Sequence, residues 1–131
     1  MSKGNERGAV AVEFALLAPL LVVFLFAIIE FGIALTRSIT YVSAAREGAR
    51  YAAVHCRPEA TVCTDALITA RVTEAAIGYP IGPGSPTADR DCTLEPGRSV
   101  TVAWQQLVPV DVPFLPDLSF TMDISGTFRC E

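Results

Sequence analysis

Residues 9–35 read AVAVEFALLAPLLVVFLFAIIEFGIAL, and Glu13 and Glu30 are their only charged side chains. A helix of this length measures about 40 Å, and a bilayer core of about 30 Å requires about 20 apolar residues. The rest of the 131-residue chain is too small to enclose a helix that is apolar on every side. The stretch therefore predicts one transmembrane helix over residues 9–35.

The length of the apolar stretch argues against a cleaved secretory signal, whose apolar core has 7–15 residues. The uninterrupted apolar run from Phe14 to Ile29 is longer than that, and apolar residues resume after Glu30. Lys3 and Arg7 precede the run, and positive charges favour the cytoplasmic side. We therefore expect a single-pass protein of the cytoplasmic membrane, with a cytoplasmic N-terminus and an extracytoplasmic C-terminal head.

Glu13 stands out because a carboxylate in lipid costs about 2.5–3.5 kcal/mol at the centre of a membrane helix. Gly8 lies five positions before it. If the chain were cut after Gly8, Ala9 would carry a free α-amino group with a pKa of about 7.7–8.0, which is cationic near neutral pH. That amine is a suitable counter-ion for Glu13, in the same subunit or in a neighbour.

These residues resemble a known family. Residues 7–14, RGAVAVEF, are similar to the class III signal of type IV prepilins and pseudopilins, in which a prepilin peptidase cuts after the glycine. Residues 7–21 (RGAVAVEFALLAPLL), together with residues 44–53 (AAREGARYAA), resemble more closely the TadE-like minor pseudopilins of tight-adherence pilus systems, also called Tad, Flp-type or type IVc.

The resemblance implies a leader over residues 1–8, cleavage between Gly8 and Ala9, and a role in assembly for Glu13 and Phe14. It implies a structural function, with a prepilin peptidase, the major Flp-type pilin, other Tad pseudopilins and the Tad platform and ATPase machinery as partners. It is compatible with incorporation in the pilus. The alternative is an unprocessed single-pass envelope protein, in which Glu13 reaches the interface and a disulfide-bonded ectodomain binds a ligand or a surface.

Two further residues of the span have alternative interpretations. Pro19 removes a backbone hydrogen bond and clashes with the carbonyl four residues earlier, so it predicts a helix kink, which membrane helices tolerate. The kink is either purely structural or a place where the helix loosens during extraction from the membrane. Glu30 is expected near the outer interface, either simply solvated there or paired with Arg37 or a neighbouring subunit.

The helix is predicted to continue outside the membrane over residues 36–55, because Thr36 to Val54 contains no proline and one glycine. Small residues at i, i+4 spacing share one face of this segment. They form two rows, Ala44, Gly48, Ala52 and Ala45, Ala49, Ala53. Small side chains let another element approach closely. The face therefore packs either on the protein's own head or on neighbouring subunits.

Residues 56–131 predict a small α+β head, so the whole chain is expected to be α+β and pilin-like, as the resemblance also implies. A second helix is expected from about Asp65 to Ile77, with Thr64 as its N-cap and Gly78 as its stop. The following segment, residues 79–86, contains three prolines and two glycines and is expected to be a loop.

The C-terminal part predicts an antiparallel β-sheet that has one buried face and one wet face. Strands are expected over residues 91–94, 99–107 and 119–129, with a type II turn at 95–98 and a proline-containing loop over 108–117. The side chains that alternate onto the buried face are Val100, Val102 and Trp104 in one strand, and Phe120, Met122, Ile124 and Phe128 in another. This face is expected to lie on the alanine-rich part of the first helix.

The cysteines Cys56, Cys63, Cys92 and Cys130 all follow the membrane segment. If the head lies outside, they are in an oxidising compartment, where disulfides persist. Three pairings exist, and we favour Cys56–Cys63 with Cys92–Cys130, because the alternation places Cys92 and Cys130 on buried strand faces. The spacing lacks the Cys-x2–4-Cys pattern of a zinc site.

Other functional classes find little support in the sequence. The formal net charge is −4 and the basic residues form no stripe, which argues against nucleic-acid binding. His55 is the only histidine, no Gly-x-Ser-x-Gly motif is present, and Gly82-Pro83-Gly84 is not a phosphate-binding loop. We predict neither an enzyme nor a cofactor or metal site, and Asp89, Asp91 and Glu95 are expected in an exposed turn.

Overall fold

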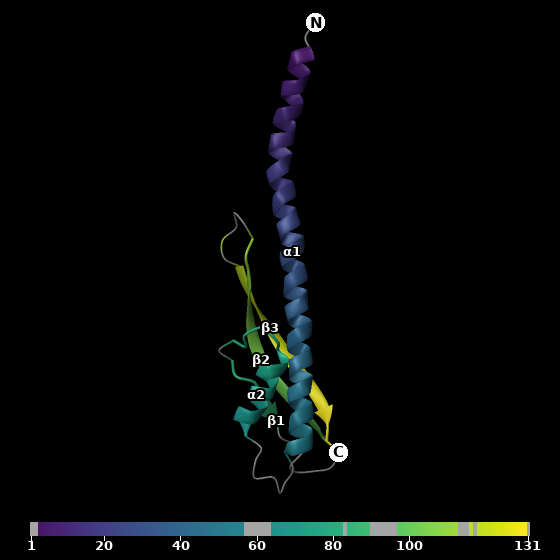
Figure 1. Ribbon diagram of the computed structural model, residues 1–131, viewed down its shortest axis with the longest axis vertical. Helices are drawn as coiled ribbons and strands as arrows, with labels where there is room; N and C mark the ends of the chain where they lie inside the picture. Colours follow the sequence, from purple (N-terminus) through teal and green to yellow (C-terminus); the bar gives the residue numbers. More distant parts are fainter. Residues whose placement is uncertain are drawn as a thin grey trace.

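The computed structural model describes residues 3–56, 64–82, 84–89, 97–112, 116 and 118–130 (Figure 1). Its elements are the helices α1 (Lys3–His55) and α2 (Asp65–Ala75) and the strands β1 (Thr87–Asp89), β2 (Ser99–Val110) and β3 (Leu118–Arg129). This is the predicted α+β architecture, with a long apolar helix, a short second helix and an antiparallel sheet.

Helix α1 has two unlike halves. It is 53 residues long, or about 80 Å at 1.5 Å per residue, and it contains Pro19 without interruption. Its N-terminal half projects alone, whereas its C-terminal half packs on the head (Figure 1). Tyr41 is the first buried residue along the described helix. One continuous rod therefore belongs to both the projecting stem and the core of the head.

Helix α2 begins and ends much as its capping residues predict. The Thr64 side chain accepts a hydrogen bond of 3.4 Å from the backbone N–H of Leu67, which satisfies one of the free donors of the first turn. The helix ends at Ala75, two positions before the predicted Ile77, and Gly78 follows with a left-handed φ of 82°. That conformation favours glycine, which explains why the chain turns away there.

The sheet has the order β1-β2-β3, and both pairings are antiparallel. Strands β2 and β3 form a long hairpin whose register runs from Ser99–Arg129 to Val110–Leu118. β2 continues beyond the predicted end at residue 107, and Pro109 pairs with Ser119. The strand tolerates this proline because β1 pairs only with residues 101–103, which leaves that edge of β2 open at position 109.

The first strand differs from the prediction. β1 comprises Thr87–Asp89, whereas a strand was expected at residues 91–94, which lie outside the described part of the chain. The sequence before β1 is rich in proline and glycine, so it gives no alternating pattern that would reveal a three-residue edge strand. The predicted turn at 95–98 is described only at its second half, where Gly97 has a left-handed φ of 95°.

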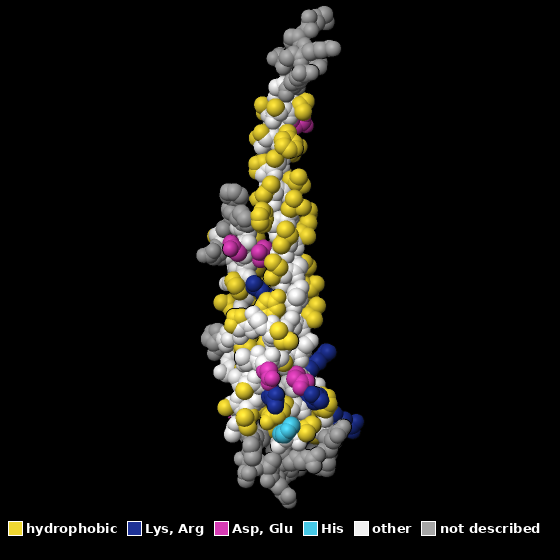
Figure 2. Space-filling view, viewed as in Figure 1, with side chains coloured by type: hydrophobic (Ala, Val, Ile, Leu, Met, Phe, Trp, Pro, Cys, Tyr) yellow, Lys and Arg dark blue, Asp and Glu magenta, His cyan; other side chains and the backbone are white. Residues whose placement is uncertain are grey.

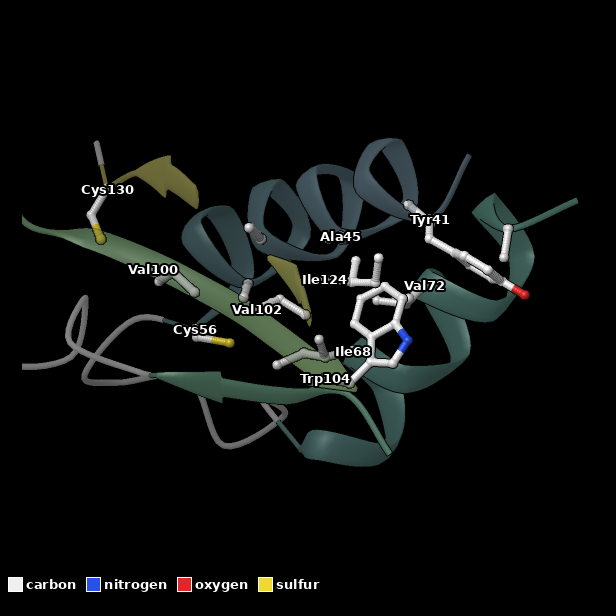
Figure 3. Packing of buried hydrophobic residues seen from close by; sticks show 14 residues of the cluster. Tyr41, Ala45, Cys56, Ile68, Val72, Val100, Val102, Trp104, Ile124 and Cys130 are labelled. Carbon is white, nitrogen blue, oxygen red and sulfur yellow. The ribbon is translucent and has the colours of Figure 1, made fainter. Parts of the chain in front are cut away.

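The core lies between α1, α2 and the sheet (Figure 3). Small residues of α1 allow this close packing, and Ile68 and Val72 of α2 fill the space beside them with no exposed surface. The predicted inward residues Val100, Val102 and Trp104 are buried, as is Ile124 of β3, whereas Met122 and Phe128 are half-buried and Phe120, also predicted to be buried, is exposed. The buried face of the sheet therefore lies on the alanine-rich part of α1, as predicted.

Cys56 and Cys130 are both buried, and no described cysteine is a free thiol. Their predicted partners Cys63 and Cys92 lie outside the described residues, so the pairings Cys56–Cys63 and Cys92–Cys130 remain predictions. The backbone N–H of Cys130 donates a 2.7 Å hydrogen bond to the carbonyl of Arg98, which holds the end of β3 against the start of β2.

Candidate functional site

The N-terminal half of α1 carries the predicted processing and assembly residues. Gly8 and Ala9 are both exposed and both helical. A Cβ built on Gly8 would have no neighbouring atom within 4 Å. The fold therefore does not require a glycine at this position, and any requirement for one must come from a process outside the folded chain.

Glu13 and Phe14 lie one turn further along the same exposed surface, and Phe14 is 69% accessible. Within the described part of the chain, the ion pairs are Glu47–Arg50 and Arg71–Glu74, so Glu13 has no counter-charge there. Ala9 and Glu13 are four residues apart in α1, which places them on one face of the helix.

The surface around these residues is apolar on every side. From Gly8 onward α1 is long and apolar enough to cross a membrane, and none of its most apolar 18-residue window is buried. Figure 2 shows hydrophobic side chains over the visible face of the projecting stem. The head leaves this surface uncovered, and its length and composition are compatible with a bilayer span.

The C-terminal half of α1 places its small residues against the protein's own head. Ala45, Ala49 and Ala52 have no exposed surface. A Cβ on Gly48 would overlap a methyl group of Val72, so α2 crosses α1 at the glycine. The structure thus uses the predicted helix-packing face within the subunit.

Polar groups join the head to α1 just above this packing region. The Tyr41 hydroxyl donates a 3.0 Å hydrogen bond to the carbonyl of Pro80, and burial raises the pKa of Tyr41 above 10.0. Its ring makes edge-to-face contacts with Tyr79 and Trp104, at centroid distances of 6.2 and 6.3 Å. Tyr41 is therefore the point at which the stem enters the head.

Gln106 is the buried polar side chain of the described core, with 4% accessibility. Its Oε1 accepts from the backbone N–H of Gly82 at 2.8 Å and from the indole N–H of Trp104 at 3.4 Å. Its Nε2 donates to the carbonyl of Leu107 at 3.1 Å. Gln106 continues the alternation of Val100, Val102 and Trp104, so its position on the buried face could have been found from the sequence, although a glutamine in a strand usually faces water.

The charged residues at the far end of α1 pair locally. Arg50 donates to both carboxylate oxygens of Glu47, at 2.7 and 3.0 Å, and this hydrogen bonding lowers the pKa of Glu47. Tyr51 stacks on His55 at 4.1 Å, and the Arg71 guanidinium lies 5.3 Å from the Tyr51 ring centre. Positive and negative side chains alternate here, so this surface carries no patch of one charge sign.

Glu30 and Arg37 do not form the ion pair that was one interpretation of the sequence. Arg37 instead donates to the carbonyl of Pro109 at 3.4 Å and lies 5.8 Å from the Tyr79 ring centre. Glu30 lies at the edge of an apolar groove between α1 and the end of the β2–β3 hairpin. No three His, Cys, Asp or Glu side chains of the described residues come together as a metal site would require.

Comparison with known proteins finds one family that is similar to the N-terminal third of the chain. The model of the TadE-like protein family matches residues 8–50, which begin at Gly8 and include Glu13 and the small-residue face as far as Ala49. No curated protein and no solved structure matches the chain. Residues 8–50, which run from the exposed apolar stem into the helix packed inside the head, are therefore similar to the TadE-like protein family.

Proposed function

We propose that the chain is a minor pseudopilin that acts structurally in the assembly of a Tad pilus. The observation that supports this most strongly is the position of Glu13. It is a carboxylate that has no counter-charge among the described side chains, and it lies on an exposed apolar stem inside the segment that matches the TadE-like family. A lone carboxylate in lipid is unfavourable, so a partner that arrives from elsewhere would stabilise it.

Cleavage after Gly8 would supply that partner. It would remove the leader of residues 1–8 and leave Ala9 with a cationic α-amino group. Because Ala9 and Glu13 lie on one face of α1, the amine can meet the carboxylate of its own chain or that of an adjacent subunit. The resulting pair would lower the cost of holding Glu13 in an apolar environment.

The rest of the chain fits a stored and later assembled subunit. Residues 9–35 anchor the protein in the cytoplasmic membrane, residues 36–55 continue the helix outside, and residues 56–131 form the disulfide-bonded head. A prepilin peptidase would process the chain. The major Flp-type pilin, other Tad pseudopilins and the platform and ATPase machinery would then take part in its assembly.

The N-terminus of the mature protein tests this proposal. We expect mass spectrometry of the chain from cells with an active pilus apparatus to find Ala9 as the first residue. Gly8→Leu should block this processing, while Gly32→Leu should not. Gly32 is a matched control because it lies in the same helix and a Cβ there also meets no atom within 4 Å. A mature chain that keeps residues 1–8 would contradict the proposal.

An unprocessed envelope protein is the second candidate. Two observations favour it: α1 runs without interruption through Gly8, and its small-residue face is already used within the subunit. In that case Gly8→Leu and Gly32→Leu would behave alike, since both would leave the N-terminus intact and the protein in the membrane. The comparison of these two variants therefore separates the candidates.

A further inference from the structure

The end of the β2–β3 hairpin lies beside a part of α1 that belongs to the membrane span. Val112, Phe120 and Met122 of the hairpin region line the same groove as Ala27 and Phe31 of α1. The strand geometry agrees with this position. Val102 lies near Gly48. From there, eight further residues of β2 extend about 26 Å, which is the rise of about 17 helical residues. Val110 is therefore expected at the level of Phe31.

The depth of this part of α1 follows from the length of a bilayer span. A core of about 30 Å takes about 20 helical residues. If Glu13 marks the inner boundary, the core ends near residue 33, and if Arg37 marks the outer boundary, it ends near residue 36. In both alignments Ala27 lies about 9–14 Å below the outer boundary. The hairpin end therefore cannot remain in bulk water while it keeps its place beside α1.

The surface of the hairpin end suits this depth. Along the α1-facing side of β3, the accessible fraction rises from 2% at Ile124 to 42% at Phe120 and 48% at Leu118. These residues remain apolar although the protein no longer covers them. Beside them the groove of about 390 Å³ is left open between Phe120 and Phe31. Its apolar lining is continuous with the exposed surface of the stem.

We propose that lipid of the outer leaflet covers the hairpin end and that an acyl chain fills the groove between the hairpin and α1. The inference rests on the membrane insertion in the proposed function, but not on cleavage after Gly8. Exposed Asp111 limits the depth, since a carboxylate is costly in hydrocarbon. It therefore favours a position in the outer part of the leaflet, where Glu30 also lies, about 4.5–9 Å below the outer boundary.

Photolabelling of the unmodified full chain tests this proposal. The chain is reconstituted at one copy per lipid nanodisc with a phospholipid that carries a diazirine on its acyl chain. Arg98 and Arg129 flank the hairpin with no lysine or arginine between them, so trypsin releases it as one peptide. We expect label on Phe120 and its neighbours as well as on the stem, and none at Thr127, which is exposed at the head end of β3.

Two variants sharpen the result. Phe120→Asp should cause a loss of label from the hairpin while the stem remains labelled, because a further carboxylate beside the groove would move the hairpin out of the acyl region. Thr127→Asp is the matched control, since it adds the same charge to an exposed position of the same strand and should leave the pattern unchanged.

The outcomes are distinguishable. Label on the stem without label on the hairpin overturns the inference and leaves the proposed function intact. Absence of label from the stem shows that the chain does not span the bilayer, which contradicts the membrane insertion itself. If hairpin label is absent in single-copy discs and the groove crosslinks to another chain in two-copy discs, a second subunit is the occupant and the lipid proposal is wrong.

Discussion

Gly126 of β3 lies directly against the backbone of Ala45 in α1, and a Cβ at position 126 would overlap the carbonyl carbon of Ala45. The sheet and the long helix therefore meet at a glycine and an alanine, the two smallest residues. This contact sets how closely the head packs on the stem.

Gly126→Ala should destabilise the head strongly. Overpacking typically costs about 1–3 kcal/mol, and we expect the upper part of this range because the neighbour is backbone, which cannot rotate away. Thermal unfolding followed by near-UV circular dichroism measures the effect. Ser125→Ala, at the adjacent exposed position, should stay within about 0.5 kcal/mol of the wild type. Equal stability of the two variants would show that the sheet is not seated on α1 in this way.

Gln106→Ala should cost more than Gln105→Ala. Without the Gln106 side chain, the Gly82 N–H loses its acceptor in a partly buried site, at a cost of about 1 kcal/mol or more. Gln105 instead bonds Asp123 on the exposed face, at 3.0 Å, and contributes less. Denaturant unfolding of the two variants compares the same truncation on opposite faces of one strand. A larger loss for Gln105→Ala would contradict the buried network.

Stability should fall with alkaline pH because of Tyr41. Burial raises the pKa of Tyr41 in the folded state above its ordinary value of 10.0, so the folded chain holds this proton more tightly than the unfolded chain. Its contribution is complete below pH 10 and is lost as the pH rises through the folded-state pKa. Tyr41→Phe should cost about 1 kcal/mol at pH 8 through the lost bond to Pro80, and it should remove this part of the alkaline decline. Unfolding at a series of pH values measures both effects, and an unchanged slope in Tyr41→Phe would refute the assignment.

Glu13→Gln should separate insertion from assembly. The neutral amide is less costly in lipid, so the variant should enter the membrane at least as well as the wild type. It cannot form an ion pair with a processed N-terminus, so we expect a lower yield in the sheared pilus fraction on immunoblots. Glu30→Gln carries the same change further along α1 and should assemble normally. Normal assembly of Glu13→Gln would remove the charge pair from the proposal.

The cysteine pairs are open to direct measurement. Peptide mapping of the unreduced protein should recover Cys56 linked to Cys63 and Cys92 linked to Cys130. Reduction should lower the stability of the head, by about 2–4 kcal/mol for each disulfide that closes a loop of ordinary size. Recovery of a link between Cys56 and Cys92 would show that the strand-face argument chose the wrong pairing.

The elements that the sequence revealed are those with strong local patterns. The all-apolar run predicted the stem, Thr64 and Gly78 bounded α2, and the alternation around Val102 and Ile124 predicted the buried face of the hairpin. The three-residue strand β1 escaped because an edge strand this short has no period to detect. Its absence from the prediction also hid the open edge that lets β2 continue through Pro109.

The contacts that position the head were not predictable from one sequence. Strand alternation places Gly126 and Gln106 on the buried face, but which residues they meet there depends on how far the hairpin slides along the helix. That offset depends on long-range packing, which leaves no periodic trace in the chain. For the same reason the sequence left the role of the Ala45 face open, although it found the face itself.

The unbroken course of α1 has a mechanical consequence. Stem and head share a single rod with no linker between them, so a push or pull on the anchored end is transmitted to the head without slack. If the subunit moves along the helix axis, the head therefore moves with the stem as one rigid body.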